Sequence, residues 1–573
     1  WIIMRFLLAA LLFILAISLL LLGVAQRTIW AAPDNFSVNL SISSEHPYVV
    51  IPAKELALIP GDPIVSSFGG EQVFMAVGRE SDVSAWIGLA SHYRSVTSDD
   101  GLALGVREVV GTSDFANPVG SDLWVSETLS EGFAEVQVPT GENLAVLIAS
   151  DGFEEAPNRV RISWPIASST VISDVFLAVG SGFLLAAIIL NLLALRKMLI
   201  NRGPRRKLPK APQGPKYRPK KVPLDLPKRG RRSARSKIAL VPVGIALTFS
   251  LMGCQAAPTP VATPSPTDSP PVAAIEAIPP VVKSAQVRKI LRELQQVVAE
   301  ADQSGDSDIL GDRVAGPALL FREAHYELMS KSSEILPLPP ISGSAISITL
   351  PAATNAWPRS FMIVTEGDGA GELPQMLVMQ QQSPRDKYKL WYNIPLLPGS
   401  EIPEVASAEV GAIPVERDSL FLRLSPIQLP NAFGDVIDKG VASEFYNLFN
   451  LEGDEYYEQI STSQKEQIER LRRAEITFTH ELGDQNVISL STSDSGALVA
   501  VLMTDNYLIR PTRENAAVTV TGDELLLLGV EGSAEGVRTQ YGGMLLFYVP
   551  AATNEGRITL LGATQSLLSI RAL

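Results

Sequence analysis

Three apolar segments decide which folds this chain can adopt. Residues 6–25 and 175–195 are uncharged runs of twenty and twenty-one residues. An α-helix needs about 20 such residues to cross the hydrocarbon core of a bilayer. A third run, residues 238–253, has sixteen residues, which is short for a complete crossing. The chain is therefore predicted to be a multidomain membrane protein, with transmembrane helices at residues 4–25 and 171–195.

Two details of these helices leave alternatives open. Residues 23–25 could serve as a signal-peptide cleavage site, but the apolar region of a signal peptide usually has about 7–15 residues, which favours a retained anchor. In the second helix Ala178, Gly182 and Ala186 recur every four residues, a pattern that lets another helix approach closely. Small residues are also common in membrane helices without such a role.

Residues 196–237 form a strongly basic loop between the second and third apolar segments. The loop contains seventeen Lys and Arg residues and one acidic residue, Asp225, whereas the rest of the chain has 31 basic and 60 acidic residues. Short cytoplasmic loops of membrane proteins carry the excess of Lys and Arg. The loop is therefore predicted to be cytoplasmic, which places residues 26–170 and 255–573 outside the plasma membrane.

Seven prolines between residues 204 and 227 favour an extended chain in this loop over a helix. Its clustered cations are expected to contact anionic lipid headgroups of the plasma membrane. Nucleic acid is not expected as a partner, because Tyr217 is the loop's only aromatic residue and bases would find no stacking platform. The residues expected at the headgroups are Arg205, Arg206, Lys207, Lys220, Lys221, Arg231 and Arg232.

The third apolar segment, residues 238–254, ends at the chain's single cysteine. A lone cysteine is commonly a small buried side chain, but Leu251-Met252-Gly253-Cys254, with basic residues before the segment, resembles the lipobox of bacterial lipoproteins. The resemblance implies that Cys254 receives a diacylglyceryl group and that a signal peptidase cuts before it. Met252 and the internal position depart from the family pattern. The segment is therefore predicted to be a third transmembrane helix or a lipoprotein-type signal.

Residues 31–168 alternate between apolar and polar side chains, most clearly at residues 36–42 and 160–164, with glycine-containing turns between such stretches. Many short strands at this spacing predict an all-β sandwich outside the membrane. Three tryptophans could line a sugar-binding face, although tryptophans in such domains are more often part of the core: Trp86, Trp124 and Trp164.

A stretch rich in Pro, Ala, Thr and Ser, residues 255–282, predicts an extended tether. Helical periodicity follows at residues 284–301, and then several strand-like stretches. The order of helices followed by strands recurs after residue 430. Two tandem α+β domains are therefore predicted, at residues 283–430 and 431–573.

This order of elements, with the sequences at residues 383–391 and 542–547, resembles a duplicated nuclear-transport-factor-2-like fold, as in some lipoproteins of actinobacteria. The resemblance implies two cone-like domains in an actinobacterial envelope protein, each with a pocket between a curved sheet and its helices. It implies no particular reaction.

No motif for catalysis or metal binding is complete. Residues 302–313 fail as a calcium loop, because the glycine stands at position 4 and Arg313 at position 12. One cysteine and four dispersed histidines give no metal-ligand spacing. No catalytic, cofactor-binding or metal-binding residue is therefore assigned. Ser360 and His480 could still belong to a triad that only the fold assembles.

The sequence thus predicts a non-catalytic, membrane-anchored envelope protein that presents extracytoplasmic domains to a cell-wall polymer, a lipid or a partner protein. The alternative is an envelope-biogenesis enzyme whose reaction takes place in an α+β cone pocket. The polarity of that pocket distinguishes the two, because convergent ionisable groups such as His480 or Asp505 would favour catalysis.

Overall fold

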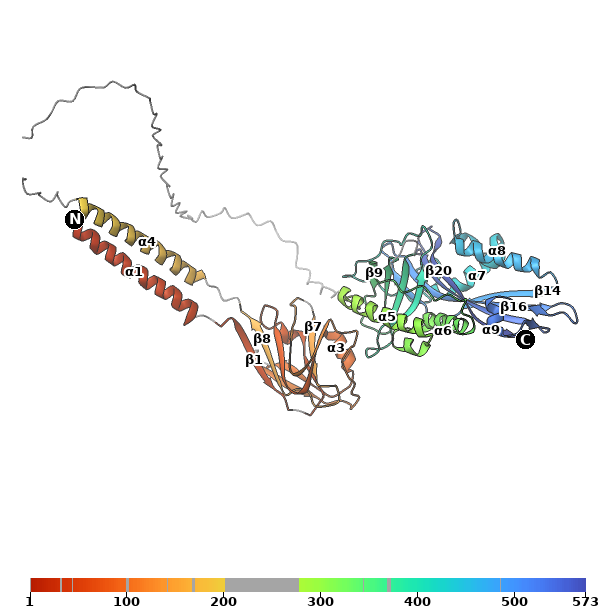
Figure 1. Ribbon diagram of the computed structural model, residues 1–573, viewed down its shortest axis with the longest axis horizontal. Coiled ribbons are helices and arrows are strands. Elements are labelled where there is room, and N and C mark those ends of the chain that lie inside the picture. Colours follow the sequence, from red (N-terminus) through yellow and green to blue (C-terminus); the bar gives the residue numbers. More distant parts are fainter. Residues whose placement is uncertain are drawn as a thin grey trace, which may run out of the picture. The chain divides into compact units, whose positions relative to one another are not determined.

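The computed structural model describes residues 2–30, 33–43, 45–98, 103–141, 143–166, 171–200, 278–343, 345–367, 373–484 and 486–573. They form two compact units, one within Trp1–Ala31 and Ser169–Glu276 and one within Ala32–Ser168 and Ala277–Leu573 (Figure 1). The basic loop beyond residue 200, residues 238–254 with Cys254, and the tether up to residue 277 lie outside the described residues. So do the residues expected at the lipid headgroups: Arg205, Arg206, Lys207, Lys220, Lys221, Arg231 and Arg232.

The first unit is an antiparallel pair of apolar helices, α1 (Ile2–Thr28) and α4 (Val171–Ile200) (Figure 1). The segments Phe6–Thr28 and Ser173–Ile200 are long and apolar enough to cross a membrane. A signal sequence forms a similar helix near an N-terminus. At one end of the pair, the Arg27 guanidinium donates a hydrogen bond to the Asp174 carboxylate.

Small residues at every seventh position form the contact between α1 and α4. They are buried on both helices, whereas most of their neighbours are exposed, and they are Ala9, Ala16 and Gly23 on α1 and Ser173, Gly180, Ala187 and Ala194 on α4. A repeat of seven residues stays on one side of a helix over many turns, and small side chains let the backbones approach closely. The apolar residues between them remain exposed, as lipid-facing residues would be.

Of the two alternatives for the second helix, the row of small residues with four-residue spacing is therefore not the face that packs against α1. Ala178 and Gly182 are exposed and Ala186 is only half-buried. A spacing of four drifts around the helix, because four residues exceed one turn of 3.6 residues. In this pair, the seven-residue spacing of Gly180 and Ala187 marks the contact face instead.

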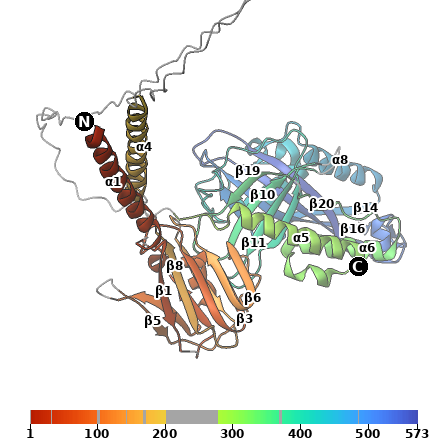
Figure 2. The same ribbon diagram turned by 60° about the vertical axis from the view of Figure 1, so that its left-hand side comes forward.

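The first β-rich part of the second unit, residues 33–166, is called the β-domain below. Its elements are β1 (Asn35–Ser41), β2 (Tyr48–Ile51), α2 (Ala53–Leu56), β3 (Ile64–Arg79), α3 (Glu80–Ile87), β4 (His92–Thr97), β5 (Leu104–Val109), β6 (Ser126–Gln137), β7 (Leu144–Ala149) and β8 (Arg159–Pro165). The eight strands form one mixed sheet in the order β1-β8-β3-β7-β2-β4-β5, with β6 also paired to β3 (Figure 2).

This sheet is nearly closed and barrel-like, so the prediction of a sandwich of two separate sheets is wrong. The physical reason is the long strand β3, which changes register against β6 between Phe68 and Gln72. Gly69 and Gly70 lie in this shift with φ of 108° and 83°, which residues with a Cβ rarely adopt. The first half of β3 pairs with β8 and the second half with β7, so one bent strand belongs to both halves of the sheet.

Both faces of the middle strands in the β-domain are buried. Trp164 lies in the barrel interior, while Trp86 and Trp124 cover the outer face of β2, β3 and β7. The three side chains are 0%, 2% and 2% exposed, respectively. They therefore belong to the core and form no exposed sugar-binding face.

Residues 278–573 are called the C-terminal body below. Its first elements are α5 (Ser284–Ser304), η1 (Ser307–Asp312), α6 (Gly316–Lys331), β9 (Ile346–Pro351), β10 (Arg359–Thr365), β11 (Gln375–Gln381) and β12 (Lys389–Pro395). The apolar residues spaced along α5 are buried against an antiparallel sheet in the order β12-β11-β10-β9.

The second set of elements is η2 (Pro426–Gln428), α7 (Leu429–Lys439), η3 (Gly440–Ala442), η4 (Tyr446–Leu448), β13 (Phe449–Asn450), α8 (Glu455–Arg470), β14 (Ala474–Leu482), β15 (Ile488–Ser491), β16 (Ala497–Pro511), β17 (Val518–Thr519), α9 (Asp523–Leu528), β18 (Gly532–Ser533), β19 (Val537–Val549) and β20 (Ile558–Ala572). A six-stranded sheet runs β13-β20-β19-β16-β14, with β15 also paired to β16. Helices followed by strands thus occur twice in the C-terminal body.

The six-stranded sheet is buried on both faces. Along β16, Leu498, Ala500 and Leu502 pack into the core that contains the four-stranded sheet. The alternating residues Val499 and Val501 pack beneath α7 and α8. The two α+β parts therefore share the core between their sheets, and a second core lies beneath α7 and α8.

The β-domain and the C-terminal body also contact each other within the second unit. Buried ion pairs join them, including Arg313 with Asp122 and Arg359 with Asp82.

The contact between α1 and α4 can be tested with two glycines of the same helix. A Cβ at Gly180 would lie 3.0–3.2 Å from atoms of Leu19 and Leu20, whereas a Cβ at Gly182 meets nothing within 4 Å. We expect Gly180→Leu to destabilise the helix pair by about 1–3 kcal/mol through overpacking. The midpoint of SDS-induced unfolding of the full chain in detergent micelles measures this. Gly182→Leu is the matched control, and equal effects of the two changes would contradict the assigned contact face.

Candidate functional site

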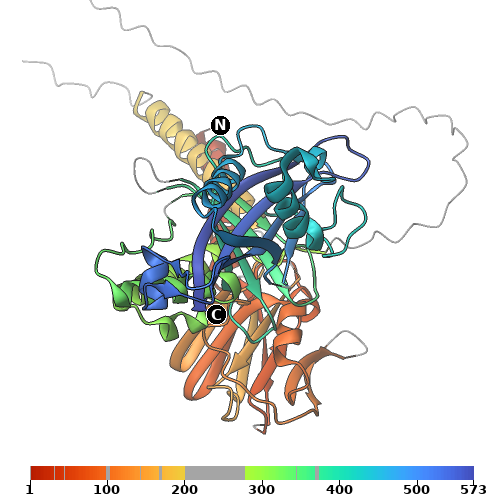
Figure 3. The same ribbon diagram turned by 90° about the vertical axis from the view of Figure 1, so that its right-hand side faces the viewer.

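The candidate site lies on the face of the six-stranded sheet that α7 and α8 cover (Figure 3). This face is apolar towards Val499 and Phe547 and becomes polar along the same strands. In the antiparallel register, His480 of β14 stands opposite Asp505 of β16, and Asp505 stands opposite Tyr541 of β19. Opposite residues share a face, so the register gathers these polar side chains at one end of the sheet.

His480 lies between two carboxylates. Its Nδ1 is 2.6 Å from an Asp505 oxygen and its Nε2 is 3.0 Å from an Asp438 oxygen. The second Asp505 oxygen accepts a hydrogen bond of 3.0 Å from the Gln565 amide. The Gln464 amide nitrogen of α8 lies 3.3 Å from the His480 Nε2. Side chains from two helices and from β16 therefore contact the imidazole ring of β14, and Gln565 of β20 holds Asp505 in place.

A glycine on α7 makes this arrangement possible. A Cβ at Gly434 would lie only 2.1 Å from the His480 Cβ, so the absence of a side chain lets α7 approach β14. Asp438 follows one helical turn later on the same side of the helix, where it reaches the imidazole.

The two carboxylates keep the imidazole charged. Burial by itself lowers the pKa of His480, but the hydrogen bonds to Asp438 and Asp505 and their negative charges raise it to about 9. Both ring nitrogens then donate hydrogen bonds. An imidazolium whose two nitrogens both donate to carboxylates has no free lone pair, so in this form His480 links Asp438 of α7 to Asp505 of β16; these three side chains are called the triad below.

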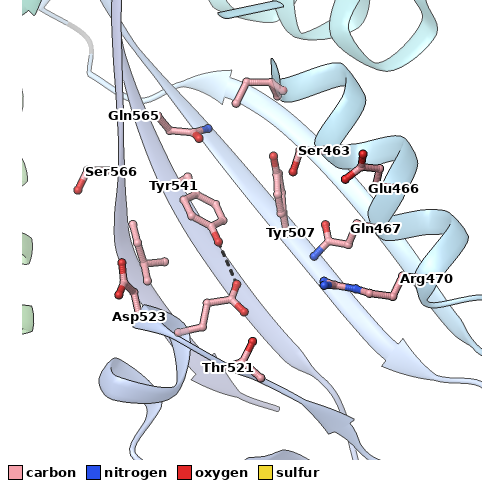
Figure 4. Close-up of a pocket in the computed structure, with 13 residues that line it drawn as sticks. Ser463, Glu466, Gln467, Arg470, Tyr507, Thr521, Asp523, Tyr541, Gln565 and Ser566 are labelled. Atoms are coloured by element: carbon pink, nitrogen blue, oxygen red, sulfur yellow. Dashed lines mark hydrogen bonds between the residues drawn. The ribbon is translucent and has the colours of Figure 1, made fainter. Parts of the chain in front are cut away.

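A pocket of about 570 Å³ opens beside the triad, between α8 and the region of α9 (Figure 4). Gln565, which holds Asp505, and Tyr507, which contacts Gln464, reach into it. The other lining residues are Ile460, Ser463, Glu466, Gln467, Arg470, Thr521, Asp523, Glu524, Tyr541, Ser566 and Leu567. The side chains from α8 face the tyrosines of the sheet across the pocket (Figure 4).

The pocket combines aromatic faces with charged groups. The Tyr507 and Tyr541 rings lie 5.2 Å apart, and the Tyr541 hydroxyl donates a 3.0 Å hydrogen bond to Glu524. Burial raises the pKa of both tyrosines, with nearby carboxylates adding to the effect, so both are neutral donors. Three acids and one base, Arg470, line the pocket. Within the described part of the chain, no group of three or more His, Cys, Asp and Glu side chains could hold a metal ion.

The structure places the residues named from the sequence as follows. His480 and Asp505 meet, while Ser360 lies on β10 of the other sheet and is not a partner of the His480 ring. Asp302, from the rejected calcium loop, lies in α5 and binds Arg322 and Tyr326 of α6. It therefore links two helices.

The pocket residues were missed by the sequence analysis. One signal was present: Asp505 interrupts the apolar run of a long strand, and Tyr507 follows two residues later on the same face. A carboxylate within a buried strand needs a partner. The sequence does not indicate that Asp438 and Gln464 are neighbours of His480, because both residues belong to helices that contact the sheet only in the folded chain.

A family model described as Domain of unknown function (DUF8094) matches residues 279–570, which is half of the chain and includes the whole site. The β-domain and both apolar helices lie outside the match. No curated protein and no solved structure matches the chain.

The charge on His480 predicts how the stability of the chain depends on pH. Because the pKa is raised from 6.5 to about 9, the stabilisation is complete below pH 6.5 and is lost as the pH rises through about 9. We expect His480→Gln to lower the thermal midpoint at pH 6 and to flatten its decline between pH 6.5 and pH 10. Calorimetry of the full chain measures both, with His325→Gln on the surface of α6 as the control. Parallel pH curves for His480→Gln and the wild type would contradict the triad.

Proposed function

The chain belongs to the family described as a domain of unknown function (DUF8094), and from that premise we propose that it is a non-catalytic, membrane-anchored envelope protein whose C-terminal body binds a hydrophilic ligand. One observation carries the proposal: an open, polar pocket stands beside a histidine that both of its neighbouring carboxylates hold in the charged form. The pocket offers groups that can bind a ligand, whereas both ring nitrogens of His480 are held by carboxylates and neither is free to act as a base.

The chemistry of the pocket favours a cell-wall polymer over a lipid as the ligand. Tyrosine faces with carboxylate and amide groups around them suit the alternating apolar and hydroxyl surfaces of a sugar. An acyl chain would leave Glu466, Gln467 and Asp523 without water or a hydrogen-bonding partner. A polar ligand keeps these groups solvated or bonded.

The alternative is an enzyme of envelope biogenesis, which the cluster of His480, Asp438 and Asp505 would favour as a group of convergent ionisable side chains. Asp505 is fully buried, and Gln565 occupies its second oxygen. Neither His480 nor Asp505 thus offers a free group to a substrate in the pocket, which is why we favour binding.

The order of the helices and the contacts between folded parts support the proposed location of the β-domain and the C-terminal body on one side of the membrane. If α1 and α4 both cross a bilayer, their antiparallel order would leave both ends of residues 33–166 on one side of it. The C-terminal body contacts the β-domain, so it belongs to that side as well. The chain would then cross once more between residues 200 and 278, where residues 238–253 are apolar.

We further propose the lipoprotein-type role of Cys254, with residues 196–237 on the cytoplasmic face at the lipid headgroups. We also retain, as a proposal, a pair of nuclear-transport-factor-2-like cones in an actinobacterial protein. The curved six-stranded sheet beneath α7 and α8, with its pocket, supports this comparison (Figure 3). The continuous core between the two α+β parts is a departure from two free-standing cones.

Ligand binding predicts a specific effect of two pocket variants. Tyr541→Ala removes an aromatic face and Glu524→Gln removes an acceptor charge, so each should weaken binding to purified cell-wall polymer about tenfold or more. Co-sedimentation of the full chain in detergent with the polymer measures this. Glu555→Gln, an exposed acid in the loop before β20, is the charge-matched control. Unchanged binding in both pocket variants would mean that the polymer does not use this pocket.

Membrane topology can be measured in spheroplasts. Protease added outside should remove a tag at Leu573 and leave residues 196–237 intact, because the positively charged loop stays in the cytoplasm. In the same cells, Cys254→Ser should abolish labelling by a lipid precursor, since the acceptor thiol is lost. A protected tag beside a digested loop would reverse the orientation, and labelling of the serine variant would exclude lipidation at Cys254.

A further inference from the structure

Two buried carboxylates of the β-domain bind arginines of the C-terminal body. They are Asp122, in the loop before β6, and Asp82, in α3. Their arginine partners lie 191 and 277 residues away in the sequence. Each pair therefore joins two parts of the chain that residues 201–277 connect.

The Asp122 carboxylate receives three hydrogen bonds from the C-terminal body. The Arg313 guanidinium donates to both carboxylate oxygens, at 2.5 and 3.0 Å. The backbone nitrogen of Tyr388 donates to one of them at 2.7 Å. The side chains of Arg313 and Asp122 are 1% and 0% exposed. Glu293 of α5 accepts a further hydrogen bond from Arg313.

Asp82 lies between two arginines, one from each part. Arg79 of the β-domain donates to both Asp82 oxygens, at 2.7 and 3.0 Å, and Arg359 of the C-terminal body donates at 2.7 Å. Arg79 also donates a 2.7 Å hydrogen bond to the carbonyl of Pro280. The Arg359 guanidinium in turn stacks on Trp357, 3.5 Å from the ring centroid.

Further contacts surround these two pairs. The Gln286 amide donates to the backbone carbonyl of Asp122 at 2.8 Å, and Lys289 pairs with Glu127 at 2.7 Å. Arg385 donates to the carbonyl of Trp86 at 2.9 Å. The interface thus has buried charges and the buried Gln286 at its centre, and partly exposed contacts of Lys289 and Arg385 around them.

The distribution of charge between the two parts makes them complementary. Arg313 and Arg359 are buried cations whose nearest β-domain carboxylates are Asp122 and Asp82. A buried charge that loses its partner is strongly unfavourable, so separation of the two parts would require hydration of all four groups. The bidentate geometry also specifies a single orientation of docking. None of these contacts uses residues 201–277.

We propose that the β-domain is a receptor for the C-terminal body, and that the two remain bound when the chain between them is cut. The chain between the two parts then brings the C-terminal body to the β-domain, and the interface keeps it bound there after the cut. A cut before Cys254, which the lipobox resemblance implies, would leave a lipid-anchored C-terminal body attached to the two-helix anchor through the β-domain. The interface does not depend on that cut or on the pocket ligand.

The test makes the cut in the intact chain. A specific protease site is inserted between Pro260 and Val261 of the full-length protein, which carries an affinity tag at its N-terminus in detergent. After complete cleavage, we expect nearly all of the C-terminal fragment to remain on the affinity resin. Asp122→Asn and Arg385→Ala should each increase the rate of its release at least tenfold. Glu135→Gln, an exposed acid of β6 with the same change of charge, should not.

Arg385→Ala is the less disruptive of the two changes, because this side chain is 27% exposed and its contacts are with Trp86, Ile87 and Asp114 of the β-domain. Separation of the wild-type fragments on cleavage would overturn the proposal. So would release rates of Asp122→Asn and Arg385→Ala that equal the rate of Glu135→Gln. Because the experimenter makes the cut, a chain that is never processed at Cys254 gives the same result. Loss of polymer binding by the pocket would not affect it either.

Discussion

The burial of both faces of one β-sheet organises the C-terminal body. Side chains alternate along a strand, so a strand with two buried faces must be apolar in both of its residue sets. β16 meets this condition from Ala497 to Met503, where one set packs on the four-stranded sheet and the other beneath α7 and α8. The pocket begins where the second set turns polar at Asp505. The apolar part of β16 thus contributes to the shared core, and its polar part contributes to the site.

The buried charges of the site and of the interface occur in compensated groups. His480 has two carboxylates, and Asp122 and Asp82 have arginines that hold them in bidentate geometry. Such groups add little net stability compared with apolar packing, but each becomes costly when one partner is removed. Their contribution is specificity: one group fixes how α7 lies on β14, and the others fix how the β-domain meets the C-terminal body.

Local periodicity allowed much of the secondary structure to be predicted. The spacing of apolar residues in α5 and the alternation in β1 and β8 describe each element separately. The errors concern how elements combine. The sandwich was wrong because β3 bends at Gly69 and belongs to both halves of the sheet. The contact face of α4 was left open by the sequence, and the pairing with α1 selects a row of small residues with seven-residue spacing.

The sequence by itself determines the apolar lengths of α1 and α4 and the contrast between a basic loop and acidic flanking regions. Both features depend only on composition within short windows. The candidate site is different. Asp438, His480 and Asp505 meet because α7 docks at Gly434 and β14 pairs with β16 in one register. Docking and register are set by packing between distant segments, so only the tertiary structure decides which charges become neighbours.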